Sequence, residues 1–324
     1  MSDSQNNGRT LLIVEGYHEK EKLFYLLLKC FPELTIKYDD ILIYKTNIYI
    51  LYDDIKKEYG ENWEQEDIDL AFLVTKDTLK LRKTNFTDIF LVFDYERQDP
   101  NFSANKIMKM QQYFSDSTEN GKLYINYPMV ESYLEILLIN METEYEHLKF
   151  YIDFKHGSEY KMKFNKIQKN HLFDFESHLN NIFKKDFNLI DNSNRTKCCK
   201  QILSCNLNKE EKLNDLLSSF LEEKYINQAK HYVWQHFKKL NLLHESYHSY
   251  LRKMFINIIY YNVCKANKIQ NDLYNIDKSN LIDTYFSLDI AEILNKQNSE
   301  SEQIWILNTS VFIVIDYNSK LFFE

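Results

Sequence analysis

The chain has 324 residues, of which 44% are hydrophobic and 15% aromatic, and its formal net charge at pH 7 is −8. This composition excludes a disordered or fibrous chain, the net charge argues against wholesale binding of nucleic acid, and the apolar runs are too short for a membrane helix. The N-terminal stretch MSDSQNNGRT has no apolar signal core and the five cysteines have no disulfide spacing, so we expect a cytoplasmic protein without a membrane partner.

The first half of the chain alternates strand-like apolar runs with segments of helical periodicity. In chain order, we expect a strand at Leu11–Glu15, a helix at His18–Cys30, an extended segment at Ile41–Leu51, a helix at Glu66–Leu81, a strand at Ile89–Tyr95, a helix at Asn101–Phe114, a strand at Lys122–Tyr127 and a helix at Val130–Met141. Continuous apolar strands separated by helices indicate a mainly parallel sheet covered on both faces, hence an α/β fold.

From about residue 150 onward the pattern becomes helical. Helical periodicity is found around Phe173–Phe187, Lys209–Leu221, Lys224–Leu243 and His248–Ala266. We therefore expect an α/β domain at residues 1–150 and a second, largely helical domain or insert at 151–324. The last apolar segment, Ile304–Asn318, fits either a pair of strands or a helix.

Charge is distributed unevenly between the two halves. Residues 1–150 carry 17 Lys and Arg against 27 Asp and Glu, whereas the stretch Lys155–Lys200 carries ten basic and five acidic residues. An acidic first half beside a basic stretch is typical of a metal-dependent enzyme that acts on a polyanion, and a solvated helical face gives the same count.

Two of the predicted strands end in carboxylates. Glu15 ends LLIVE, and Asp94 and Glu96 end IFLVFDYE. The carboxyl ends of parallel strands border the crevice in which α/β proteins bind ligands, so these acids should converge there. The D-Y-E spacing places Asp94 and Glu96 on one side of an extended segment, where they could hold one hard cation such as Mg²⁺. Glu19 could join them or complement the start of its helix.

At these residues the sequence resembles the toprim domain of topoisomerases, bacterial primases and OLD-family nucleases. The shared strings are VEGYHE at Val14–Glu19 and FDYE at Phe93–Glu96, and the one departure is D-x-E in place of D-x-D. The resemblance implies a toprim-like sheet, Glu15 as ligand or acid–base group, and Asp94 and Glu96 as ligands of Mg²⁺ or Mn²⁺. No primase zinc module or topoisomerase tyrosine domain has a visible counterpart, which leaves the nuclease branch.

A third string adds to this resemblance. NYPMVESYLEI, Asn126–Ile136, is similar to a motif that follows the toprim core in stand-alone toprim effectors of anti-phage systems, including the nuclease subunit of PARIS-type defence. The resemblance implies that Glu131 is a further metal-site carboxylate. It also implies a regulatory ATPase or another defence-system protein as partner, and self-association stays open.

The hypothesis from the sequence is a Mg²⁺-dependent nuclease that cleaves phosphodiester bonds in DNA or RNA as an effector of bacterial anti-phage defence. Its catalytic residues would be Glu15, Asp94 and Glu96. Residues from the basic stretch, for example Arg195, Lys197 and Lys200, would contact substrate phosphates.

Two other classes of function stay open. HESYH, residues 244–248, matches the H-E-x-x-H pattern in which two histidines on one helical face bind zinc and the glutamate acts as general base of a protease. The third class is a non-catalytic interaction protein with a degenerate toprim fold.

Overall fold

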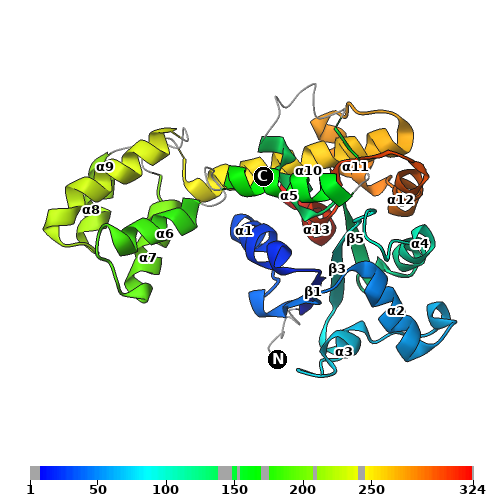
Figure 1. Ribbon diagram of the computed structural model, residues 1–324. Coiled ribbons are helices and arrows are strands. Elements are labelled where there is room, and N and C mark those ends of the chain that lie inside the picture. The colour runs from blue at the N-terminus through cyan, green and yellow to red at the C-terminus, as the bar shows by residue number, and fades with distance from the viewer. Residues whose placement is uncertain are drawn as a thin grey trace, which may run out of the picture. The chain divides into compact units, whose positions relative to one another are not determined.

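The computed structural model of the protein describes residues 8–137, 148–151, 154–168, 175–206, 210–239 and 245–322. The chain forms two compact units (Figure 1). Unit 1 comprises Met1–Lys161 and Asn257–Glu324, and unit 2 comprises Met162–Ile256. The helical part is therefore an insert, and the predicted boundaries are wrong in one respect, because residues 257–324 return to unit 1.

Unit 1 is built on a six-stranded, mostly parallel sheet. Its strands are β1 (Thr10–Val14), β2 (Ile41–Ile43), β3 (Asp88–Asp94), β4 (Ser115–Asp116), β5 (Gly121–Tyr127) and β8 (Leu307–Asn308). The order is β2-β1-β3-β5-β4, with β8 paired to β5; β2, β1, β3 and β5 are parallel, and the short β4 and β8 are antiparallel to β5.

The central strands are buried on both faces, as their unbroken apolar sequences predict. All five residues of β1 are buried, and in β3 only Asp88 is partly exposed. The helix that follows β1 covers one face of the sheet, and α2, α3 and α4 cover the other (Figure 1). The chain moves across the sheet in one direction from β1 to β2 and in the other from β2 to β3 and β5. Because crossovers between parallel strands are right-handed, this reversal places the connecting helices on opposite faces.

The remaining elements of unit 1 are mostly helical. They are η1 (Glu19–Phe24), α1 (Tyr25–Cys30), α2 (Ile48–Tyr59), α3 (Leu70–Thr75), α4 (Ala104–Tyr113), the 3₁₀ segment η5 (Val130–Leu137), the start of α5 (Phe154–Gln168), the end of α10 (Tyr247–Asn271), α11 (Leu281–Phe286), α12 (Ile290–Ser299) and α13 (Ile313–Tyr317). A second small sheet pairs β6 (Lys149–Tyr151) with β7 (Gln303–Trp305). None of the described helices combines the length and apolarity needed to cross a bilayer.

Two predicted elements of the first half differ from the structure. The extended segment predicted at Ile41–Leu51 is a strand only as far as Ile43, and α2 begins at Ile48. The Asn47 side chain accepts a hydrogen bond from the Ile50 amide (3.1 Å), and this N-cap outweighs the strand propensity of the isoleucines. The helix predicted at Glu66–Leu81 is shorter, since Asp69 caps α3 at Phe72 N (3.0 Å).

Unit 2 is helical, as the periodicity predicts. Its described helices are α6 (Phe175–Lys185), α7 (Asn192–Ser204), α8 (Glu210–Ser218) and α9 (Glu223–Lys239), with the end of α5 and the start of α10. Leu179 and Phe183 of α6 are buried among them, together with Cys198 and Cys199 of α7. These two thiols belong to the apolar core of unit 2.

The final apolar segment contains both structures that its sequence allows, namely the short strands β7 and β8 and then α13. Asn308 of β8 is fully buried, and its amide nitrogen donates to the Val130 carbonyl (2.9 Å) and to Ser132 Oγ (3.1 Å). Its backbone amide donates to Asn262 Oδ1 of α10 (2.8 Å). Buried polar groups need such partners, so this network fixes η5 beside β5.

Candidate active site

Glu15 and Asp94 lie next to each other at the carboxyl edge of the sheet. β1 and β3 are parallel neighbours, with Val14 paired to Val92. The Glu15 amide donates to the Val92 carbonyl (3.1 Å), and the Asp94 amide donates to Glu15 Oε2 (3.1 Å). The carboxylate of Glu15 therefore turns toward the end of β3, as expected from the two acidic strand ends.

The Asp94 carboxylate is buried with an oxygen that has no protein partner. The residue is 3% exposed, and its Oδ1 atom accepts no hydrogen bond. An uncompensated buried carboxylate oxygen is costly unless a cation or a proton satisfies it. This oxygen is therefore the clearest sign that the site accepts a further ligand.

Glu19 and Glu131 bring two more buried carboxylates to this edge. Glu19 is 3% exposed and its Oε2 accepts from the Gly16 amide (3.0 Å), at the turn between β1 and the helix. Glu131, in the first turn of η5, has its Oε1 3.6 Å from His18 Nδ1, and its Oε2 is buried without a hydrogen-bond partner.

Glu96 reaches the site in a different geometry from the one predicted. The strand ends at Asp94, and Glu96 has a φ of +32°, in the left-handed region. The extended D-Y-E segment that would place Asp94 and Glu96 on one side therefore does not exist, and that prediction is wrong. Such a backbone conformation is unfavourable for a glutamate.

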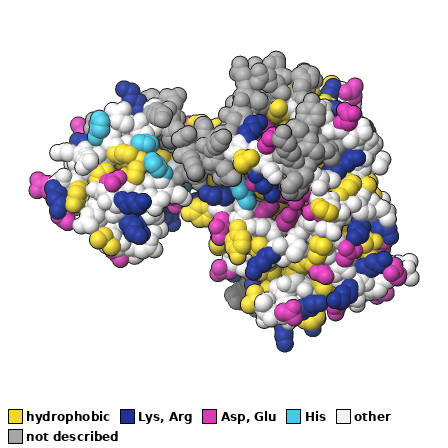
Figure 2. All heavy atoms as spheres, in the orientation of Figure 1, with side chains coloured by type: hydrophobic (Ala, Val, Ile, Leu, Met, Phe, Trp, Pro, Cys, Tyr) yellow, Lys and Arg dark blue, Asp and Glu magenta, His cyan; other side chains and the backbone are white. Residues whose placement is uncertain are grey.

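Lys161 supplies a positive charge among these acids. It lies on α5 within the predicted basic stretch, where no local pattern distinguishes it from the other lysines. Its Nζ atom lies 3.2 Å from Glu96 Oε1, and its side chain is 45% exposed. Figure 2 shows acidic side chains gathered beside basic and histidine side chains on unit 1.

Burial and mutual repulsion govern the protonation of the acids. Burial, and next the charge of Glu96, raise the pKa of Glu15 well above its ordinary value. Burial and the charge of Glu15 raise the pKa of Asp94 in the same way, and burial raises the pKa of Glu19 to about 7. Burial opposes the charge of Lys161, but attraction by Asp94 and other acids outweighs it and raises its pKa.

The carboxylate oxygens of these acids suit a hard divalent cation, although they do not all converge on one metal position. All five acids offer oxygen, which Mg²⁺ and Mn²⁺ prefer, and two of the buried oxygens, on Asp94 and Glu131, have no hydrogen-bond partner. Within the described part of the chain, no group of three or more His, Cys, Asp or Glu side chains is arranged to hold a metal ion. The acids are thus gathered at one edge but not brought together as a finished set of ligands.

Arg195, one of the three predicted phosphate contacts, is a structural residue. It is 6% exposed, and its Nη1 donates to the carbonyls of Leu189 (2.9 Å) and Ile190 (2.7 Å). Its Nε and Nη2 atoms donate to Asn180 Oδ1 (2.5 Å) and Asn192 Oδ1 (2.6 Å). The guanidinium therefore stabilises the start of α7, and the prediction that Arg195 contacts phosphate is wrong.

Lys197 and Lys200 lie on α7 with exposed side chains. Both belong to unit 2, whereas the carboxylates belong to unit 1. Their predicted contact with phosphate stays a prediction.

The described part of the zinc-protease motif does not lie on one continuous helix. Its motif requires residues 244–248 on one helix, but α10 begins at Tyr247, and His244 lies outside the described residues. The Glu245 carboxylate is bound by Lys253 Nζ (2.8 Å) and by Ser249 Oγ (3.2 Å). Glu245 is therefore not placed as the general base of such a helix.

Comparison with known proteins identifies no relative. No protein-family model, no curated protein and no solved structure matches the chain. The chemistry of the site therefore rests on the residues themselves.

The raised pKa of Glu19 predicts that the metal-free protein loses stability as pH rises. The folded state holds this proton up to about pH 7, whereas the unfolded chain releases it near 4.5. The contribution of Glu19 to the free energy of unfolding is therefore complete below about pH 4.5 and is lost as pH rises through 7. At 1.36 kcal/mol per pKa unit, the loss is at most about 3 kcal/mol. Urea unfolding in EDTA at pH 5.5 and 8 should show a smaller decrease for Glu19→Gln than for wild type. The exposed Glu119→Gln control should match wild type, and an unchanged decrease in Glu19→Gln would contradict the assignment.

The position of Lys161 among the acids predicts that its positive charge weakens metal binding. Lys161→Met leaves the repulsion among the acids uncompensated, so the metal-free protein should be less stable and bind Mn²⁺ at least about ten-fold more tightly, since a unit charge a few ångströms away contributes more than ~1.4 kcal/mol. Thermal unfolding across a Mn²⁺ titration measures both. The exposed Lys57→Met on α2 is the control, and an affinity for Mn²⁺ equal to or weaker than that of wild type would show that Lys161 does not compete with the metal.

Proposed function

We propose that this protein is a Mg²⁺- or Mn²⁺-dependent nuclease with a toprim-like catalytic unit. The observation that carries the proposal is the buried, unpartnered Oδ1 of Asp94 beside Glu15 at the carboxyl edge of a parallel sheet. The first and second acidic motifs lie on adjacent parallel strands, which is the arrangement that the toprim resemblance requires. Substrates would be DNA or RNA.

The acids would divide into ligands and a proton carrier. Asp94, Glu131 and Glu19, with Glu96, would hold the metal, which would polarise the phosphodiester and lower the pKa of a bound water. Glu15 is the candidate general base, because its carboxylate lies beside Asp94 at the end of β3, where it could take a proton from an attacking water.

Lys161 would contribute to the binding of substrate. We call the carboxyl edge of the sheet with Glu15, Glu19, Asp94 and Glu131 the acidic edge. Lys161 projects from α5 beside it, so once its ammonium is released from Glu96 it can neutralise a phosphate of the bound strand. A role in anti-phage defence in the cytoplasm, with a regulatory ATPase or another defence protein as partner, follows from the family resemblance alone and is part of the same proposal.

Cleavage of end-labelled DNA and RNA tests the nuclease. Glu15→Gln and Asp94→Asn should each reduce Mg²⁺- or Mn²⁺-dependent cleavage by about 100-fold or more, the range found when a group acting in the transition state is removed. Both changes keep the shape of the side chain. Circular dichroism should show that both variants remain folded.

The matched control is Asp77→Asn, which neutralises an exposed acid in the turn after α3. Its cleavage should equal that of wild type. Undiminished cleavage by both site variants would contradict the proposal. Absence of cleavage by wild type, with no effect of Mn²⁺ on its thermal unfolding, would favour the non-catalytic interaction protein.

A further inference from the structure

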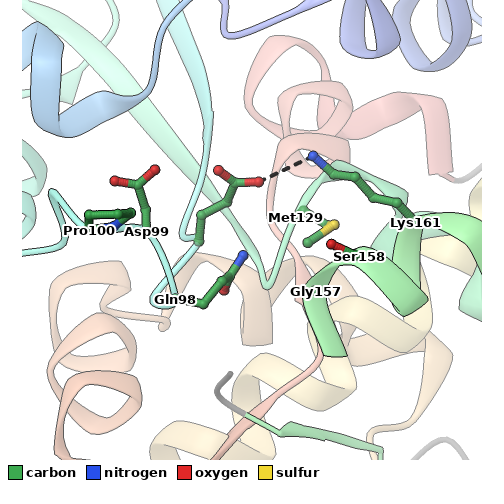
Figure 3. Close-up of a pocket in the computed structure, with 8 residues that line it drawn as sticks. Gln98, Asp99, Pro100, Met129, Gly157, Ser158 and Lys161 are labelled. Atoms are coloured by element: carbon green, nitrogen blue, oxygen red, sulfur yellow. Dashed lines mark hydrogen bonds and ion pairs between the residues drawn. The ribbon is translucent and has the colours of Figure 1, made fainter. Parts of the chain in front are cut away.

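A pocket of about 170 Å³ adjoins the acidic edge. The loop from Glu96 to Pro100 forms one side, the first turns of α5 form the other, and Met129 contributes from the segment before η5 (Figure 3). Glu96 and Lys161 belong to this pocket and adjoin the acidic edge, so a group bound in the pocket would lie beside the proposed metal.

The size of the pocket suits one small ring system. Pockets that enclose a whole drug-sized ligand usually measure about 300–1,000 Å³, so this one is too small for a base pair or a complete dinucleotide. Pro100 is exposed and gives the pocket an apolar surface, whereas Met129 is buried beneath it. A planar group with an apolar face and a polar edge therefore fits.

Gly157 leaves room for the Gln98 amide at the wall of the pocket. A Cβ atom at Gly157 would lie 3.1 Å from Gln98 Nε2, closer than a side chain comfortably allows, so a larger residue would displace the amide. Figure 3 shows Gln98 on the loop side and Gly157 and Ser158 on α5. A residue larger than glycine at position 157 would therefore narrow the space of the amide.

Two hydrogen-bonding groups that line the pocket are available to a ligand. Neither the Gln98 amide nor the Ser158 hydroxyl bonds to any residue that the structure describes, although both line the pocket. A primary amide offers donors and an acceptor together, which matches the mixed donor–acceptor edge of an unpaired nucleobase.

The charges of the lining exclude a free anion as the preferred occupant. Glu96 and Asp99 are acidic, and the one cation among the lining residues, Lys161, is already paired with Glu96 at 3.2 Å. A phosphate placed in the pocket would meet net negative charge, whereas a neutral base would not. The phosphate of the same nucleotide would instead lie outside the pocket, beside the proposed metal, whose charge would neutralise it.

We propose that this pocket receives one unpaired base of a nucleic acid strand, at the nucleotide next to the scissile phosphate. The inference rests on the proposed nuclease function and names its substrate class: strands with an unpaired nucleotide, as in single strands, loops or bulges, rather than continuous duplex. Gln98 reads the polar edge of the base, and Pro100 contacts its face.

Binding to two labelled duplexes tests this inference without requiring cleavage. One duplex is continuous and the other carries a single bulged nucleotide, each made as DNA and as RNA. Fluorescence anisotropy is measured with Ca²⁺ in place of Mg²⁺, which keeps a divalent charge beside the carboxylates. Wild type should bind one of the bulged duplexes about five- to ten-fold more tightly than its continuous counterpart, since one or two net hydrogen bonds of 0.5–1.5 kcal/mol distinguish them. Gln98→Leu should lose this difference while its affinity for the continuous duplex stays unchanged.

The matched control is Gln112→Leu, the same substitution at an exposed glutamine of α4 outside the pocket, which should behave as wild type. Equal affinity of wild type for bulged and continuous duplexes overturns the inference, as does a Gln98→Leu variant that keeps the preference. Absence of binding to all four duplexes overturns it as well. If the protein cleaves nucleic acid but shows no preference for the bulge, only the proposal about the pocket is wrong. If it prefers the bulge but does not cleave, only the proposed nuclease function is wrong.

Discussion

Electrostatic repulsion among buried carboxylates at one edge of the sheet is the constraint on which the candidate site depends. Glu15, Glu19 and Asp94 are held in surroundings that raise their pKa values, first through burial and then, for Glu15 and Asp94, through the charges of other acids. The structure relieves this conflict only in part, through the Gly16 amide and the ammonium of Lys161. A divalent cation would relieve more of it, because its charge acts on several carboxylates at once.

The positions of these acids depend on parts of the chain that are distant in sequence. β1 and β3 fix Glu15 and Asp94 directly through parallel pairing. Glu131 depends on η5, whose backbone at Val130 is held by Asn308, 178 residues later. The return of residues 257–324 to unit 1 therefore completes the edge of the sheet at which the acids lie. Unit 2 is inserted into unit 1, which is not contiguous in sequence.

The strand ends could be predicted from sequence, whereas the surroundings of the acids could not. The apolar runs before Glu15 and Asp94 specify buried parallel strands, and neighbouring parallel strands end at the same edge. Lys161 had no such local signal, since Glu96 lies 65 residues before it and only tertiary packing brings them together. Arg195 was misjudged because a basic count does not distinguish an exposed side chain from one that holds a helix end. The turn at Glu96 also overrode the period-two spacing of D-Y-E, and the pocket beside it depends on packing between that turn and α5.

The most direct measurement of the central claim is the anomalous scattering of Mn²⁺ in crystals of the wild-type protein. The account predicts a Mn²⁺ peak in contact with the Asp94 carboxylate and at least one of Glu15, Glu19 and Glu131, with Lys161 moved away from Glu96. A structure with no Mn²⁺ at this edge, in which the contact between Lys161 and Glu96 is retained at saturating metal, would contradict it.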